Sequence, residues 1–412
     1  MVNPADAIGI FVREHTAAQI DFLAQIVRIP SDNPVGDCTP AALQTAALIE
    51  ALGLTVERHE VPAEKVRAVG MVSVTNLIVR HRFGDGITVA LNAHGDVVPP
   101  GTGWTQDPYG AAVVDGWMYG RGAAVSKSDF ATYVFALLAL RASGAALRGS
   151  VELHLTYDEE SGGEIGPRWL LEQGISQPDL AIGAGFSYGV VNAHNGCLHL
   201  EVTVIGRSAH AAKPYTGIDA LEAATHVLAA LYECRKRLAA QVSAIVGIGS
   251  PQLTIGLIEG GINTNVVPDR VVFRLDRRMI PEENPGEVEN TLRTVIATAA
   301  TAFPAATVSV RRILLAEPLT PLPGAARLTE LLCAHASRVM EETITAGGTP
   351  LYTDARHYAA HGVPIVLYGA GPRSIEEANA HRADERLFLA DLPKATEVVA
   401  RTLMDLLAAT DP

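Results

Sequence analysis

The feature that most restricts the fold of this chain is a series of short apolar runs that end in polar or glycine residues. Residues 87–98 read ITVALNAHGDVV, residues 150–163 read SVELHLTYDEESGG, and residues 178–185 read PDLAIGAG. A continuous apolar run of this length is typical of a strand that is buried on both faces. A helix is predicted between the first two runs, at residues 127–142. Strands separated by helices predict an α/β fold with a mostly parallel sheet and helices on both faces.

The pattern changes near His194, and the following segment predicts a smaller α+β domain. Its order is strand, helix, strand, strand, helix, strand, at residues 197–210, 219–240, 251–261, 270–279, 285–301 and 307–315. This order is that of a ferredoxin-like domain. Residues 362–371, GVPIVLYGAG, again predict a buried strand that suits the first sheet. We therefore predict a main domain of residues 1–195 and 315–412, into which residues 196–314 are inserted.

Composition and charge exclude several classes of protein. The chain has 412 residues, more than one hydrophobic core usually organises, so two domains are expected. Its formal net charge of −13 argues against nucleic acid as a partner, because phosphate binding needs a basic face. The most apolar run, residues 133–140, is too short to span a bilayer, and the N-terminus has no signal-peptide pattern. The four cysteines are widely spaced and form no C-x-x-C pair, which is typical of thiols in the reducing cytosol. Together these features predict a soluble, cytoplasmic protein with no membrane partner.

Imidazole and carboxylate side chains follow the first two apolar runs directly. His94 and Asp96 end the first run, and Glu159 and Glu160 end the second. Ligands of parallel α/β sheets bind beyond the carboxyl ends of the strands, where these four side chains are expected to lie. A metal-bound histidine commonly donates its second ring N–H to a carboxylate, and a neighbouring carboxylate raises the pKa of a general base. Each motif alone also fits a hydrogen-bonded or acidic surface turn, and His381 alone fits a structural role.

Taken together, six motifs resemble those of the aminoacylase, acetylornithine deacetylase, succinyl-diaminopimelate desuccinylase and glutamate carboxypeptidase family of zinc hydrolases. The motifs are NAHGDVVPPGTGWTQDPYG, DGWMYGRGAAVSK, TYDEESGG, GRSAHAAKPYTGIDAL, GGINTNVVPD and AHRADERL, and the resemblance runs from about residue 10 to residue 405. It implies a catalytic domain with two metal ions and an inserted ferredoxin-like dimerisation domain. It also implies a homodimer that hydrolyses amide bonds of N-acyl amino acids or small peptides.

Carried onto this sequence, the resemblance assigns roles to five residues of the catalytic domain. His94 becomes a metal ligand that Asp96 supports. Glu159 becomes the general base that takes a proton from water. Glu160 and His381 become ligands of the second metal.

Other residues are candidates for contacts with the substrate. The resemblance implies that His210 crosses the dimer interface to stabilise the oxyanion, and that Asn265 and Arg278 touch the substrate. Arg356 and Arg373 are candidates because a guanidinium fork binds a carboxylate through two parallel hydrogen bonds. A structural ion pair is the alternative role for either arginine.

The sequence departs from the family pattern at two ligand positions. Val125 stands in place of the bridging aspartate, and Ala184 in place of the acid after the third strand. Two cations about 3.5–4 Å apart need a bridging anion, and valine supplies none. His94, Glu160 and His381 remain, and two histidines with a glutamate form the open ligand set of several single-zinc hydrolases. We therefore predict one zinc ion at most, with a metal-free centre as the alternative.

Nearby residues are candidates to replace a lost ligand. Asp129 lies one helical turn beyond Val125, but a capping pair with Ser126 at the start of the predicted helix is the simpler interpretation. Three weaker candidates lie near the other lost position: Ser187, Tyr188 and His194.

Three functional readings remain open at this stage. The first is an amidohydrolase or deacylase that acts on a small carboxylate-bearing amide through Glu159 and at most one metal ion. The second is a metal-free enzyme of the same fold that uses Glu159 and the histidines for acid–base chemistry. The third is a non-catalytic protein that binds a small molecule in the same pocket.

Overall fold

The computed structural model describes residues 3–409 and divides into two compact units. The first unit comprises the chain up to Asn192, Pro321–Gly347, and the chain from Thr353 onward. The second unit comprises Ala193–Thr320 and Gly348–Tyr352. A backbone hydrogen bond links the segment Gly348–Tyr352 to the rest of the second unit: Gly348 N donates to Val246 O at 2.7 Å. Each unit has its own cluster of buried apolar side chains.

The first unit is built on an eight-stranded sheet with the order β1-β2-β6-β3-β7-β14-β8-β13. Its strands are β1 (Glu57–Glu60), β2 (Thr75–Arg82), β3 (Thr88–His94), β6 (Ser150–Thr156), β7 (Leu180–Gly183), β8 (Val190–His194), β13 (Ala346–Thr349) and β14 (Ile365–Leu367). β6, β3, β7 and β14 pair in parallel, whereas β1–β2, β2–β6 and β14–β8 are antiparallel. The sheet is thus parallel at its centre, as predicted, and mixed toward its edges. A separate three-stranded sheet has the order β15 (Arg386–Phe388), β5 (Trp117–Tyr119), β4 (Ala112–Val114).

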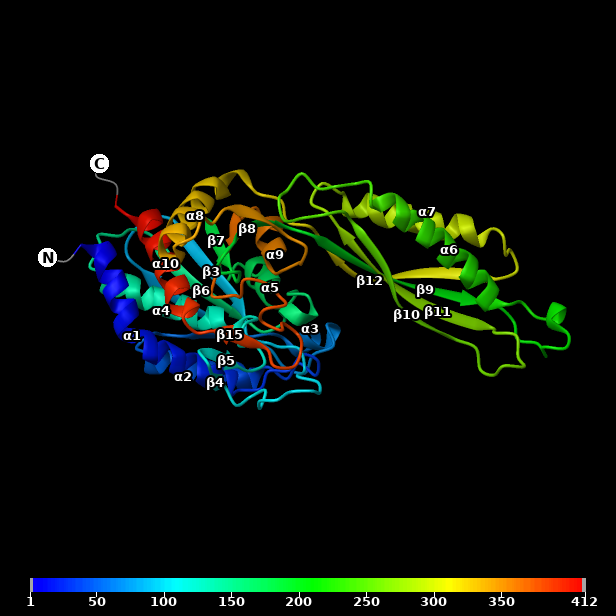
Figure 1. The fold of residues 1–412 in the computed structure, drawn as a ribbon, viewed down its shortest axis with the longest axis horizontal. Helices are drawn as coiled ribbons and strands as arrows, with labels where there is room; N and C mark the ends of the chain where they lie inside the picture. Colours follow the sequence, from blue (N-terminus) through cyan, green and yellow to red (C-terminus); the bar gives the residue numbers. More distant parts are fainter. Residues whose placement is uncertain (1–2, 410–412) are drawn as a thin grey trace. The chain divides into compact units, whose positions relative to one another are not determined.

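Helices pack around the central sheet of the first unit. They are α1 (Pro4–Val27), α2 (Thr39–Ala51), α3 (Ala63–Ala68), α4 (Lys127–Ala142), α5 (Pro167–Glu172), α8 (Ala326–Met340), α9 (Ala355–Ala360) and α10 (Asp391–Leu407). α4 contacts β3 and β6, and α1, α4 and α10 pack on one another (Figure 1). Nearly all of α4 is buried, which explains why the helix carries apolar residues on every side. Within residues 3–409, no helix combines the length and the apolar character needed to cross a membrane.

The second unit has the ferredoxin-like order that the sequence predicts. Its elements are β9 (Gly196–Ile205), α6 (Ala220–Leu238), β10 (Gln252–Gly260), β11 (Arg270–Met279), α7 (Pro285–Ala300) and β12 (Thr307–Ala316). The four strands form an antiparallel sheet with the order β10-β11-β9-β12, and α6 and α7 cover one face of it (Figure 1). Side chains alternate along β9, so Leu198, Leu200, Val202 and Val204 face the core of this unit. Cys197 and His199 belong to the opposite face.

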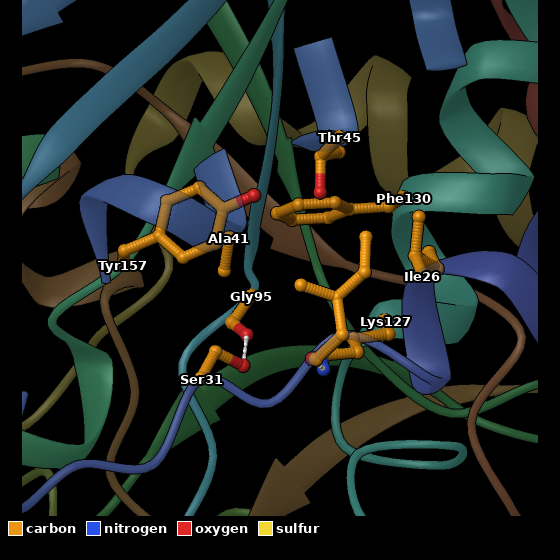
Figure 2. A pocket seen from close by; sticks show the side chains of 9 residues that line it. Ile26, Ser31, Ala41, Thr45, Gly95, Lys127, Phe130 and Tyr157 are labelled. Carbon is orange, nitrogen blue, oxygen red and sulfur yellow. Dashed lines mark hydrogen bonds between the residues drawn. The ribbon is translucent and has the colours of Figure 1, made fainter. Parts of the chain in front are cut away.

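A glycine determines how the chain leaves β3. Gly95 lies against the rings of Tyr157 and Phe130, which meet edge to face with centroids 5.9 Å apart (Figure 2). A Cβ at Gly95 would lie 2.6 Å from a ring carbon of Tyr157 and 2.9 Å from one of Phe130. Ser31 Oγ fixes the turn by donating to Gly95 O at 2.6 Å, on the wall of the small pocket that Figure 2 shows. Only glycine therefore fits between His94 and Asp96.

Replacing Gly95 by alanine should destabilise the protein by about 1–3 kcal/mol, because the added methyl group must displace two buried rings. Urea unfolding followed by circular dichroism measures the change. Gly189→Ala is the matched control: its added Cβ meets no atom within 4 Å, so the variant should stay within about 0.5 kcal/mol of the parent. Equal stabilities for the two variants would contradict the packing argument.

Candidate active site

The carboxylate of Asp96 connects the end of β3 with the turn that follows β6. Its Oδ1 accepts the backbone N–H of Glu159 at 3.2 Å, and its Oδ2 accepts that of Glu160 at 3.1 Å. Asn33 Nδ2 donates to the same Oδ2 at 2.9 Å. Asp96 is fully buried, so its charge is balanced by these donors and by His94 rather than by solvent. One side chain therefore sets the positions of both glutamates.

Asp96 also orients the ring of His94. His94 Nδ1 lies 3.0 Å from Asp96 O and 3.4 Å from Asp96 Oδ1, so these contacts assign the proton to Nδ1. The other ring nitrogen, Nε2, faces Glu159, with 4.0 Å between Nε2 and Oε2. Burial alone would lower the pKa of His94, but the hydrogen bond to Asp96 and the charge of Glu159 outweigh it and raise that pKa. The ring thus presents Nε2 to the site, as a metal-ligating histidine does.

The ligand atoms gathered at this site fit a metal ion. His94, Glu159 and Glu160 each offer one atom, and the three atoms lie within 4.8 Å of one another. His381 Nε2 lies 3.2 Å from Glu160 Oε1, and the His381 side chain is half exposed. Imidazole nitrogens and carboxylate oxygens are ligands that zinc accepts. The structure brings five of the predicted residues together in one cluster: His94, Asp96, Glu159, Glu160 and His381.

Burial changes the acidity of Glu159. Its pKa is raised to about 7: removal of the carboxyl from water is the largest cause, His94 lowers the pKa, and the charges of Glu160 and Asp96 raise it. Asp158 and Asp354, both buried nearby, also have pKa values well above the usual range, because of burial and because of neighbouring acids. A carboxyl group whose pKa lies close to neutrality is suited to accept and return a proton.

A second buried acid, Glu385, holds the loop that carries Val125. Its Oε1 accepts the backbone N–H groups of Ala124 at 3.1 Å and Val125 at 3.2 Å, and Arg121 Nη1 donates to Oε2 at 2.6 Å. The sequence analysis did not select Glu385, although it stands in the AHRADERL motif beside His381. The signal that could have found it is the pairing of an acid in that motif with the arginine of the GRG turn.

The two positions that lack an acid contribute apolar contacts instead. Val125 and Ala184 are partly buried and pack against the core of the first unit. They supply no charge to the site.

The structure corrects the interpretation of Ser126 and Asp129 as a helix-capping pair. Ser126 makes no side-chain capping bond; its Oγ contacts the backbone N and O of His94, each at 3.1 Å. Asp129 is almost fully buried and accepts the N–H groups of Ala370 at 2.7 Å and Gly185 at 3.3 Å. Burial raises its pKa to about 7. Asp129 therefore joins the loops after β7 and β14, and both of its oxygens are engaged with backbone rather than turned to a metal.

The weaker substitutes for a lost ligand also have other partners. Ser187 Oγ donates to Gly371 O at 2.8 Å, and Tyr188 Oη donates to Asp391 at 2.8 Å. His194 Nδ1 lies 2.9 Å from Asn195 O in the second unit.

The three candidate arginines occupy different environments. Arg356 is buried, donates to Thr353 O at 3.1 Å and to Gly162 O, and its charge lowers the pKa of Glu159 against the effect of burial. Arg373 is exposed, forms a two-bond ion pair with Glu342 and lies over the ring of Tyr188. Arg278, in the second unit, pairs with Asp276 at 3.0 Å.

Two of the three candidate residues in the second unit lie together. Ala211 N donates to Asn265 O at 3.0 Å, which places His210 and Asn265 on adjacent exposed segments. His210 Nδ1 accepts the N–H of Ala212 at 3.0 Å, so its Nε2 carries the proton and can donate. Arg278 lies far from these two residues. It pairs with Cys197 near the N-terminal end of β9, whereas His210 follows the C-terminal end of that strand.

The ends of β3 and β6 thus present a histidine and two glutamates within 4.8 Å of one another, an arrangement that metal-dependent hydrolases use. Residues 90–405 match the family described as Peptidase family M20/M25/M40. The chain belongs to this family, which is metal-dependent, and it is a hydrolase of amide bonds.

Individual relatives agree with this assignment. A succinyl-diaminopimelate desuccinylase of Rhodospirillum centenum is 28% identical over an alignment of 422 positions, which covers 95% of this chain and 98% of the relative. An M20 family metallo-carboxypeptidase from Sulfolobus solfataricus shares the fold with a TM-score of 0.77 at 16% identity, over 94% of this chain and 98% of that chain. A dinuclear metal-binding peptidase of the M20 family from Bacillus subtilis has a TM-score of 0.67 at 18% identity, over 96% of this chain and 99% of that chain.

Proposed function

We propose that this enzyme removes an acyl group from a small carboxylate-bearing amide, an N-acyl amino acid or a dipeptide-like compound, with Glu159 as the general base. The observation that carries the proposal is the partly buried Glu159 carboxyl, whose pKa is raised by burial to about 7 and whose Oε2 lies 4.0 Å from His94 Nε2. The full-length similarity to a protein named as a desuccinylase supports an acyl amide as the substrate class.

We place one zinc ion at most in the centre, held by His94, Glu160 and His381. When bound, zinc supplies a Lewis acid that polarises the substrate carbonyl and makes water more acidic. Glu159 lies beside these ligands and takes the proton from the attacking water, then returns it to the leaving amine. Asp96 keeps His94 in the required tautomer and holds the Glu159–Glu160 turn in place. Val125 and Ala184 leave no anion to hold a second cation.

Arg356 and Arg278 are our candidates for binding the substrate carboxylate. Arg356 is buried near Glu159 and carries its charge into the interior of the first unit. Arg373 is a weaker candidate, because both of its terminal nitrogens are paired with Glu342, whereas Arg278 pairs with Asp276 through Nε.

We further propose that the enzyme acts as a homodimer in which His210 of one copy serves the centre of the other. Within one second unit, Arg278 pairs with Cys197 near the start of β9, whereas His210 lies beyond Ile205, the last residue of that strand; Cys197 and Ile205 are eight residue pairs apart. At about 3.3 Å per residue this is roughly 26 Å, so a rigid sheet cannot bring both side chains to one substrate. A homodimer removes this conflict, because the His210 that serves the centre then comes from the other copy. Cytoplasmic placement suits the enzyme, because no disulfide joins its four cysteines, which all lie in the described part of the chain.

Glu159→Gln should lower kcat by about 10²–10⁴-fold, because the amide cannot accept the proton from water. Turnover of a panel of N-succinyl, N-acetyl and dipeptide substrates measures the effect. Glu164→Gln is the matched control, because this surface acid forms an ion pair with exposed Arg168 and should leave turnover unchanged.

The wild-type value of kcat/KM should rise as the pH increases through about 7, because Glu159 acts as a base only when it is ionised. Full activity of the Glu159→Gln variant would contradict the proposal that Glu159 is the general base.

The metal content of the centre should be one equivalent per chain at most. Elemental analysis of zinc in the wild type, minus that in Glu160→Gln, isolates the ion at this site from any other bound zinc. A difference of one equivalent is expected, because His94, Glu160 and His381 form a single open ligand set. A difference of two equivalents would contradict the account, since it would require a paired centre without its bridging acid. Loss of activity on chelation, and recovery with added zinc, should accompany the single ion.

The dimer proposal predicts complementation between two inactive variants. Co-expressed Glu159→Gln and His210→Ala chains, purified as a heterodimer through two different tags, hold one centre with both Glu159 and a partner's His210. That heterodimer should regain about half of the wild-type activity, whereas each homodimer stays inactive.

His210→Ala alone should reduce kcat more than it changes KM, because an oxyanion donor acts in the transition state. A heterodimer as inactive as its parents would place His210 outside the neighbouring centre.

A further inference from the structure

A second group of metal-binding side chains lies in the second unit, on the face of its sheet opposite α6 and α7. We call Cys197, His199 and Asp276 the Cys197 cluster. Cys197 and His199 are two residues apart on β9 and share one face. Asp276 is the direct cross-strand partner of His199 on β11. All three side chains therefore project from paired strands.

The three ligand atoms already have nearly the spacing that a common ion requires. Cys197 Sγ lies 3.3 Å from His199 Nε2, His199 Nε2 lies 2.9 Å from Asp276 Oδ2, and Sγ lies 3.7 Å from Oδ2. Thiolate, imidazole and carboxylate ligands bind tetrahedral zinc at about 2.0–2.3 Å, which separates the ligand atoms by roughly 3.3–3.6 Å. Small side-chain movements would place all three around one ion.

The geometry argues against the other chemistry that these residue types could perform. In a cysteine–histidine–aspartate relay the thiol and the carboxylate contact opposite nitrogens of the ring. Here both the sulfur and the carboxylate oxygen approach the same nitrogen, His199 Nε2. Three ligand atoms that converge on one point fit an ion shared between them.

The surroundings of the cluster fit an open metal site. Arg278 Nε donates to Asp276 Oδ1 at 3.0 Å and to Oδ2 at 3.2 Å, and such outer hydrogen bonds orient a ligating carboxylate. Cys197 is fully buried, whereas the side chains of His199 and Asp276 are about one-third exposed. One side of the cluster therefore faces solvent and leaves room for water as a fourth ligand.

We propose that the second unit binds a zinc-class divalent ion through Cys197 Sγ, His199 Nε2 and Asp276 Oδ2. The combination of thiolate and imidazole selects zinc and similar metals over magnesium and calcium. None of its three ligands belongs to the His94 centre, and the site stands whether or not the proposed deacylase activity is correct.

Cobalt(II) added to the full-length, metal-stripped protein tests the site, because a cobalt–thiolate bond gives a near-ultraviolet charge-transfer absorption that nitrogen and oxygen ligands do not give. The wild type should show this absorption at one equivalent of thiolate-bound cobalt. Cys197→Ala should lose it, and His199→Ala should bind that cobalt at least about tenfold more weakly.

Two control variants separate the cluster from other sites. Cys234→Ala removes another buried thiol of the same unit and should keep the absorption. Glu160→Gln alters the His94 centre and should also keep it. Absence of the absorption in the wild type, or its persistence in Cys197→Ala, would overturn the proposal. If Cys197→Ala does not fold by circular dichroism, His199→Ala decides the question: unchanged cobalt affinity there would also overturn it.

Discussion

The carboxylate of Asp96 is the constraint on which the candidate active site depends. It accepts the backbone N–H groups of Glu159 and Glu160, and it faces Nδ1 of His94. Because these contacts join the ends of β3 and β6, the parallel pairing of the two strands is what brings His94, Glu159 and Glu160 together. Gly95 makes the arrangement possible, since a side chain there would collide with Tyr157 and Phe130. Folding and chemistry thus rely on the same short turn.

The replacement of two acids changes the charge of the centre without removing its framework. Glu385 still holds the Val125 loop through two backbone N–H groups and Arg121. Val125 and Ala184 contact the core of the first unit. The absence of an acid at these two positions supports the single cation that we propose. The raised pKa of Glu159 follows from its burial and from the charge of its neighbour Glu160. The loop is therefore held in place without an acid at position 125.

The elements that could be predicted from the sequence are those with a strong periodic pattern. The helix at 127–142 and the order of the ferredoxin-like unit follow from apolar periodicity, and both are confirmed. The ends of β3 and β6 could also be predicted, because polar residues follow each apolar run directly. The antiparallel outer strands of the main sheet were not predicted, because periodicity does not report the direction of a neighbouring strand.

Contacts between distant segments account for the remaining errors. Asp129 was interpreted as a helix cap, but it binds backbone groups of Gly185 and Ala370, which no local pattern encodes. Glu385 and the Cys197 cluster were missed for the same reason, since cross-strand register brings Asp276 beside His199 from 77 residues away. Spacing along the chain identifies strand ends, whereas the partners of a buried acid are set by tertiary packing.

The metal affinity of Asp96→Asn, compared in a Cys197→Ala background with the parent, tests the central role of Asp96 most directly. Competition with a chromophoric zinc chelator measures this affinity at the His94 centre alone. The account predicts a 10- to 100-fold weaker affinity, roughly the cost of losing an outer-shell partner of a ligating histidine. Unchanged affinity in a folded variant would contradict it, because the ligands would then be positioned without the Asp96 carboxylate.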